Sequence, residues 1–295
     1  MKDIAISATA LNNSIRIHAV CTTAMVEQAR QKQDLYPTSC AALGRVMSAS
    51  AIMASTLKNE NDRYAVNING HGPAGTILAQ ADGKGNVRGF IGDPHIDYFN
   101  EQTGKLDVGR AVGRDGYLRV MLDQGLKEPF TGTVDLVSGE IGDDFAAYFV
   151  KSEQTPTAIA VGVLIDKDYS VASAGGLLIQ LMPDTPEEVI ETVEKTVQNM
   201  KPISTLMKEM QSVDEVVLSL FPDAEIMSHK DVQWHCGCSR EHFLDSLAVL
   251  KEKDLEDMIN EDHGAEIVCQ YCCTKYTFSE EELRAILEKR HTCGK

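Results

Sequence analysis

Two pairs of cysteines carry the clearest chemical signal in this 295-residue sequence. Cys236 and Cys238 stand one residue apart in WHCGCSREHF, and Cys269 and Cys272 stand two residues apart in EIVCQYCCTKY. Alternate side chains of an extended segment share one face, and a tight turn brings the sulfurs of a CxxC sequence together. The sequence therefore predicts one closed tetrahedral site of four thiolates, the arrangement that structural zinc prefers, with one Zn²⁺ per chain.

The other cysteines, and the histidines that flank the first pair, are not expected to bind the ion, because four thiolates already fill a tetrahedral site. These residues are His235, His242, Cys273, Cys293, Cys21 and Cys40. The two histidines are expected behind the ligands or at the surface. Cys273 should point away from Cys272 in an extended run, and Cys293 lies near the end of the chain. The first two cysteines of the sequence fall in segments predicted to be buried, where cysteine packs as a small apolar residue.

The bound ion is expected to decide whether the end of the chain folds. A module of about 60 residues seldom gains more than about 3–5 kcal/mol from its own core, whereas structural zinc contributes roughly 10–16 kcal/mol at neutral pH. Thiolates are also the form of cysteine that peroxide oxidises, and each pair holds its own resolving partner. A disulfide across one intervening residue is strained and easily reduced. The spacing alone leaves open whether the four sulfurs are a passive clasp or a redox switch.

Charge and composition disfavour several classes of function. The net charge is −16, and residues 231–295 alone carry a net −6, so no nucleic-acid partner is predicted. The first residues show no charged segment followed by an apolar stretch, and the longest apolar run, AIAVGVLI, is too short to span a membrane. We therefore predict a cytoplasmic protein without a membrane partner. In that reducing compartment eight cysteines favour metal or redox chemistry over a fixed disulfide framework.

Residues 1–182 are predicted to form an α+β core with a mixed sheet and packed helices, because strands occur in runs and helices are grouped. Periodicity and small residues favour helices at 22–31 and 39–57, with a short one at 142–150. Strands separated by Gly-rich turns are expected within 63–92, where DGKGN connects a hairpin. Further strands are predicted at 116–123, 130–139, 157–166 and 169–182.

Residues 183–230 are predicted to form a helical linker of three short amphipathic helices, with Pro202 and Pro222 at their ends. The apolar faces of these helices must pack against another surface, and a helical layer over the sheet would account for them. The linker is expected to be coupled to the terminal module and to form part of the surface that binds other proteins.

Residues 231–295 are predicted to form a small zinc-binding α+β module. Ser239 is expected to cap its first helix, and the CxxC sequence should lie in the tight turn of a hairpin. Ser279 and Glu282 form a capping-box pattern ahead of the last helix.

The sequence resembles the heat shock protein 33 family, the redox-regulated chaperones also called 33 kDa chaperonins. The resemblance is carried by CxC followed by SRE, by CxxC within VCQYC, and by the core blocks DGYLRVMLDQGLKEPFTGTVDLVSGEIGDDFAAYFVKSEQTPTAIAVGV and AGGLLIQLMP. It covers essentially the whole chain. Residue by residue, it implies that Cys236, Cys238, Cys269 and Cys272 are both the zinc ligands and the redox-switch cysteines.

The resemblance also implies an activity. In the family, the reduced protein binds zinc and is inactive, and oxidation forms two disulfides, here Cys236–Cys238 and Cys269–Cys272, with release of the zinc. The terminal module and linker then unfold, and the protein dimerises and holds unfolding client proteins without ATP. ATP-dependent foldase chaperones receive the clients later. Cys273 is an addition to the minimal motif and opens a second possible partner for Cys272.

Three alternatives follow from the residues alone. A zinc ribbon that binds nucleic acid would need a basic surface. A thiol oxidoreductase with CQYC as its active-site dithiol would place that sequence at the start of a helix, where the dipole lowers a thiol pKa, whereas the predicted neighbours are strands. A zinc clasp on a hydrolase or kinase finds no P-loop, HExxH or GxSxG motif in support. We therefore predict that the protein is not an enzyme.

Overall fold

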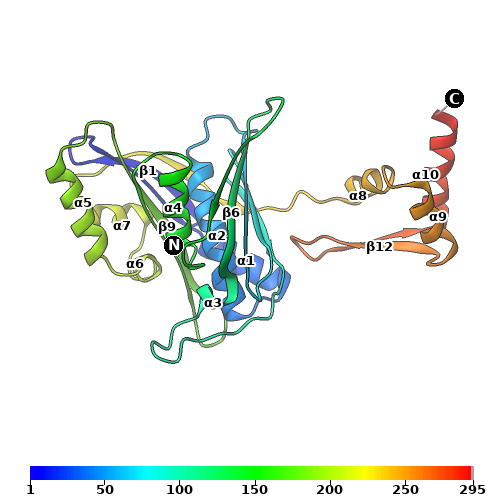
Figure 1. Ribbon diagram of the computed structural model, residues 1–295, viewed down its shortest axis with the longest axis horizontal. Helices are drawn as coiled ribbons and strands as arrows, with labels where there is room; N and C mark the ends of the chain where they lie inside the picture. The colour runs from blue at the N-terminus through cyan, green and yellow to red at the C-terminus, as the bar shows by residue number, and fades with distance from the viewer. Residues whose placement is uncertain (294–295) are drawn as a thin grey trace. The chain divides into compact units, whose positions relative to one another are not determined.

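The computed structural model describes residues 1–293, with the side chains of residues 1–290. The chain divides after His235 into two compact units, Met1–His235 and Cys236–Lys295. Each unit combines sheets with helices, which confirms the predicted α+β class (Figure 1). No helix in the described part of the chain has the length and apolar character needed to cross a membrane.

The first unit contains two sheets. One is antiparallel throughout, with strand order β10-β1-β2-β9-β8. Its strands are β1 (Ile4–Ala10), β2 (Ile15–Cys21), β8 (Thr157–Ile165), β9 (Val171–Leu181) and β10 (Glu225–Asp231). The other has the order β11-β5-β4-β3-β6-β7 and is mixed, because β11 runs parallel to β5. Its strands are β3 (Arg63–His71), β4 (Ile77–Asp82), β5 (Asn86–Ile91), β6 (Gly113–Asp123), β7 (Phe130–Asp135) and β11 (Gln233–Trp234).

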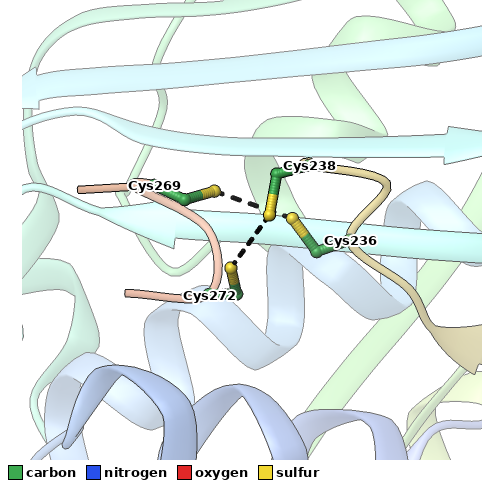
Figure 2. Close-up of side chains that lie close together, drawn as sticks. All are labelled: Cys236, Cys238, Cys269 and Cys272. Carbon is green, nitrogen blue, oxygen red and sulfur yellow. Dashed lines mark hydrogen bonds between the residues drawn. The ribbon is translucent and has the colours of Figure 1, made fainter. Parts of the chain in front are cut away.

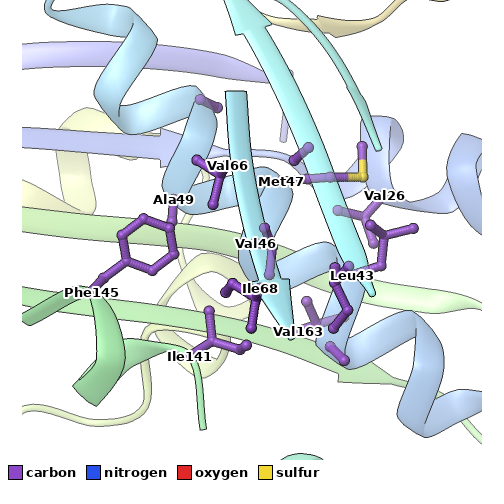
Figure 3. Packing of buried hydrophobic residues seen from close by; sticks show 14 of the residues in the cluster. Val26, Leu43, Val46, Met47, Ala49, Val66, Ile68, Ile141, Phe145 and Val163 are labelled. Atoms are coloured by element: carbon purple, nitrogen blue, oxygen red, sulfur yellow. The ribbon is translucent and has the colours of Figure 1, made fainter. Parts of the chain in front are cut away.

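Helix α2 (Pro37–Ser55) packs against strands of both sheets and is buried along almost its whole length. Its many alanines, serines and a glycine keep the helix narrow enough to lie between two layers. Leu43, Val46 and Met47 pack there among side chains from both sheets (Figure 3). Three further helices complete this core: α1 (Thr23–Gln33), α3 (Val108–Val112) and α4 (Gly142–Lys151). The predicted long buried helix is confirmed.

The opposite face of the first sheet is covered by the three amphipathic helices, as predicted. They are α5 (Glu187–Asn199), α6 (Ile203–Glu209) and α7 (Val213–Leu220). Helix α6 lies especially close to the sheet at Gly162 and Gly175, which are paired across β8 and β9. A Cβ atom at Gly175 would stand too close to the carbonyl oxygen of Val20 in β2 and 3.1 Å from the side chain of Met207, so a larger residue would clash with the neighbouring strand and crowd the helix. The two glycines therefore allow α6 to pack closely against β8 and β9.

The segment after α7 connects the two sheets. β10 is an edge strand of the first sheet, and β11 adds to the edge of the second. The backbone N–H groups of Gln233 and His235 donate to the carbonyls of Gly85 and Val87, each at 2.9 Å. Residue 231, where the terminal module is predicted to begin, is the last residue of β10. The division of the chain by role into 1–182, 183–230 and 231–295 stays a prediction.

The second unit is a small α+β module. Its elements are α8 (Arg240–Leu247), α9 (Glu252–Asn260), β12 (Gly264–Val268), β13 (Lys275–Ser279) and α10 (Glu280–Cys293). Ser239 caps α8 by accepting from the N–H of His242 at 3.2 Å. The capping box is present too, because the Glu282 N–H donates to Ser279 Oγ at 3.3 Å and the Ser279 N–H to a Glu282 carboxylate oxygen at 3.0 Å. The predicted caps and hairpin are confirmed.

Candidate metal centre

The four cysteines come from two segments of the second unit. Cys236 and Cys238 lie in the irregular stretch before α8, and Cys269 and Cys272 lie in the turn between β12 and β13. Their sulfurs point toward one another (Figure 2). Cys238 Sγ is 3.3 Å from Cys272 Sγ, Cys236 Sγ is 3.7 Å from Cys269 Sγ, and all four atoms lie within 4.8 Å of one another.

The hairpin turn sets the direction of the second pair. The Cys269 N–H donates to the carbonyl of Thr274 at 3.0 Å, and the Cys273 N–H donates to the carbonyl of Cys269 at 2.8 Å. These bonds close a tight turn in which Cys273 takes a left-handed conformation, with φ of 55°. Cys273 is exposed and stands outside the sulfur cluster, while both cysteines of the pair are buried. The turn thus separates two ligand candidates from their neighbour.

Two of the four thiols resist ionisation when no cation balances them. Burial raises the pKa of Cys238 to about 12 against an opposing hydrogen bond from Tyr276, and crowding by the other thiols adds to the rise. Burial likewise raises the pKa of Cys269 against the N–H groups of Cys272 and Tyr271. At Cys272 burial also opposes ionisation, but hydrogen bonds from the hydroxyl and the N–H of Thr274, together with those from Cys238 and Cys269, outweigh it and lower the pKa to about 7. A bound cation is therefore what would hold all four as thiolates.

The donor set and its geometry fit a metal ion. Four sulfurs at about 2.3 Å from one tetrahedral ion would lie about 3.8 Å apart, close to the distances observed here. No carboxylate or imidazole joins the four sulfurs in this group among the described residues. A closed set of four soft ligands leaves no open position for substrate, which is typical of a structural site. The four cysteines could therefore hold a metal.

The remaining cysteines and histidines lie elsewhere. His235 and His242 are exposed, and neither is part of the cluster. Cys21 and Cys40 are buried in the first unit, in β2 and α2, as predicted. The side chain of Cys293 lies outside the described residues.

Two residues beside the sulfurs were not predicted. Tyr276 Oη lies 3.2 Å from Cys238 Sγ, and Thr274 Oγ1 lies 3.2 Å from Cys272 Sγ. Both belong to the segment that follows the CxxC turn. Because alternate residues of a strand share a face, residues 274 and 276 could have been placed on one side, but the pattern does not say that this side faces the cluster.

Removing the Tyr276 hydroxyl should weaken metal binding. Tyr276→Phe deletes the polar contact to Cys238 and leaves the ring, which packs 5.0 Å from the ring of Phe243. Partners of metal ligands contribute roughly tenfold or more to affinity, so we expect about tenfold weaker binding of zinc. Competition against a chromophoric chelator measures this, with Tyr169→Phe, an exposed tyrosine of the first unit, as the control. Equal affinity in the two variants would contradict a role for the hydroxyl.

Comparison with known proteins places the chain in a family. The model of the Hsp33 protein family matches residues 3–279. The chain belongs to the Hsp33 family. It is 43% identical over 290 residues to the 33 kDa chaperonin of Bacillus velezensis, covering 97% of this chain and 99% of the relative. It is 41% identical over 288 residues to the 33 kDa chaperonin of Bacillus subtilis, with coverage of 97% and 99%.

A solved Hsp33 structure shares the fold. The crystal structure of the 33 kDa chaperonin, a heat shock protein 33 homologue, from Thermotoga maritima is 36% identical, with a TM-score of 0.90. The structural match covers 99% of this chain and 100% of the Thermotoga maritima chain. The predicted family is confirmed, and the names of these Hsp33 relatives support a chaperone function. Hsp33 is a family of chaperones and not a class of enzymes.

Proposed function

We propose that this chain is a redox-regulated, ATP-independent holdase chaperone, inactive when reduced and zinc-bound and activated by oxidation. The observation that carries the proposal is the convergence of four cysteine sulfurs in a unit with a very small core. The hydrophobic cluster of buried side chains described there consists of Leu247, Leu255, Ile259, Phe278, Leu283 and Ile286. Such a core contributes about 3–5 kcal/mol, so a structural ion worth roughly 10–16 kcal/mol governs folding.

Zinc is the proposed ion because four thiolates in a closed tetrahedron suit it best. Cys236, Cys238, Cys269 and Cys272 would each supply one sulfur, for one ion per chain. When bound, the ion would offset part of the negative charge of the four thiolates and tie the segment before α8 to the hairpin. The same thiolates remain the groups in the unit most open to an oxidant.

Oxidation would remove the ligands pairwise. A thiolate attacks hydrogen peroxide to give a sulfenic acid and hydroxide, and a second thiolate displaces hydroxide from the sulfenic acid to form a disulfide. We propose Cys236–Cys238 and Cys269–Cys272 as the products, because chain proximity persists while the site comes apart. The shortest sulfur distances join cysteines of different pairs, but all sulfurs are nearly equidistant in a tetrahedral site. Peptide mapping of the oxidised protein would identify the pairing.

Unfolding of the second unit would then reach the linker through the chain itself. One residue separates Cys236 from the end of β11. Along the chain, α7 is followed by β10 and then by β11. The helices α5, α6 and α7 cover a sheet face that includes Ile6, Ile17 and Ile179. Their release would expose this aliphatic face together with Met207 of α6, a surface suited to varied unfolded chains. Hydrogen exchange in which residues 183–230 stay equally protected after oxidation would contradict this coupling.

The other parts of the proposal concern partners and place. Clients are unfolded or partly folded proteins, the active form is a homodimer, and ATP-dependent foldase chaperones receive the clients. The proposed setting is the cytoplasm, where reducing conditions keep the four cysteines reduced and able to bind zinc until oxidative stress.

One experiment tests the central claim. Zinc release, free thiols and suppression of the aggregation of a heat-unfolded test protein are measured on the same samples, before and after peroxide with mild heat. We expect the loss of the four cluster thiols and of one zinc per chain to coincide with a gain in aggregation suppression. If oxidation strips the zinc but leaves suppression unchanged, the cluster is a clasp and not a switch.

A further inference from the structure

A cavity of about 550 Å³ lies in the first unit and is lined by residues of that unit. Its lining includes two cross-strand rows of the first sheet. In one row Ser7 pairs with His18, and His18 pairs with Leu178; in the next, Thr9 pairs with Arg16, and Arg16 pairs with Gln180. Side chains from the end of α2, from β3 and from the end of α4 complete the lining. The volume is in the range of binding sites in proteins.

An unsatisfied polar group belongs to this lining. His18 is 5% exposed, and its Nε2 has no hydrogen-bond partner among the described residues. Its Nδ1 has only a long contact, 3.5 Å, with Ser55 Oγ. Burial, aided by the charge of Arg16, lowers the pKa of His18 to about 4, so the ring is neutral at pH 7. A buried polar atom without a partner in the protein bonds to an ordered water or to a ligand.

The chemistry of the lining points to a neutral ligand with both polar and apolar parts. The two charged side chains, Arg16 and Glu153, have opposite signs, so the cavity has no preference for an anion or a cation. The lining combines hydroxyls, an amide and an imidazole with the apolar side chains of Met53, Phe149 and Leu178. The backbone amides of a polypeptide would form hydrogen bonds with these polar groups, and its apolar side chains would pack against the apolar residues of the lining.

We propose that this cavity binds an extended segment of an unfolded polypeptide, which makes it a client subsite of the holdase and so rests on the proposed function. The position of β10 supports this occupant. Met227 of β10 contributes to the lining and is 64% exposed, so one wall belongs to the strand that precedes the cysteine module. Movement of β10 upon oxidation would widen the cavity, which lies on the face of the first sheet opposite to the aliphatic face already proposed for clients.

Direct peptide binding tests the subsite. The probe is a fluorescent heptapeptide with blocked ends that alternates leucine and serine, and anisotropy gives its affinity for the full-length protein, reduced and oxidised. Thr9→Trp would fill the cavity from its sheet side, and we expect at least tenfold weaker binding. Met227→Ala removes an exposed wall residue without disturbing the core, and we expect about fivefold weaker binding. Met121→Ala, a partly exposed methionine of β6 outside the lining, is the matched control and should bind as the unaltered protein does.

The outcomes separate this proposal from the holdase itself. If the oxidised protein suppresses aggregation but the peptide does not bind, or binds Thr9→Trp and Met227→Ala unchanged, the subsite is wrong and the holdase stands. If peptide binding is lost in both variants while oxidised, unaltered protein fails to suppress aggregation, the cavity is a peptide-binding site, and the holdase and with it the role as a client subsite are wrong.

Discussion

Cys272→Ser is expected to abolish tight metal binding and to leave the second unit unfolded even under reducing conditions. Cys272 supplies one of the four converging sulfurs, and a serine hydroxyl is a far poorer ligand for a soft site. The unit then depends on a core worth about 3–5 kcal/mol and loses most of the roughly 10–16 kcal/mol that the ion provides. Zinc content and hydrogen exchange of residues 236–290 measure the two effects.

Cys273→Ser is the matched control for this variant. Cys273 is the next residue in the chain, is exposed, and stands outside the cluster. We expect full zinc content and native hydrogen exchange in Cys273→Ser. A folded, zinc-loaded unit in Cys272→Ser would show that three sulfurs suffice, and zinc loss in Cys273→Ser would show that the fifth cysteine takes part.

The proposed switch adds a functional expectation to the same pair of variants. If loss of the ion is the activating event, Cys272→Ser should suppress aggregation without any oxidant, whereas Cys273→Ser should still require peroxide. An inactive Cys272→Ser whose second unit is unfolded would mean that unfolding alone does not activate, and that the disulfides themselves are needed.

The metal site could be predicted from the sequence because its signal is local. The spacing within each cysteine pair fixes how two sulfurs converge, and the hairpin around Cys269 and Cys272 is short enough to be recognised from its own residues. What surrounds the sulfurs could not be read in this way. The contact of Tyr276 with Cys238 spans 38 positions of the sequence, and only folding of the unit brings it about.

The fold of the first unit was predicted in class and in most helices, but several strands were not predicted. β1 and β2 do alternate between apolar and polar residues, as in Ile15–Arg16–Ile17–His18, so a local signal for these two strands was present in the sequence. β10, in contrast, carries no sequence pattern that identifies it as a strand. Its sequence EIMSHKD is polar because it is an exposed edge strand, and its partner β1 lies at the other end of the unit's sequence. Long-range pairing of this kind leaves no local pattern.

Phe221→Ala is expected to activate the protein without touching the metal site. Phe221 is 2% exposed and packs at the end of α7, between the linker helices and the first sheet. Truncation of a buried phenylalanine costs about 3–5 kcal/mol. If only the linker helices lose this stability, a loss of about 3 kcal/mol in the free energy of their local opening raises the population of the opened linker by about a hundredfold. Reduced Phe221→Ala should therefore suppress aggregation while it keeps one zinc per chain.

Leu218→Ala provides the comparison, since Leu218 lies on the same helix but is 39% exposed. We expect this variant to need oxidation for activity, as the unaltered protein does. Hydrogen exchange should show faster opening of residues 203–231 in Phe221→Ala only, and hydrophobic dye binding should rise with it. If Phe221→Ala opens this segment and stays inactive, the aliphatic face of the first sheet is not where clients bind. Opening of the linker helices would then have a different effect from loss of the zinc ion. Activation would depend on the unfolded cysteine module itself and not on the sheet face that its unfolding exposes.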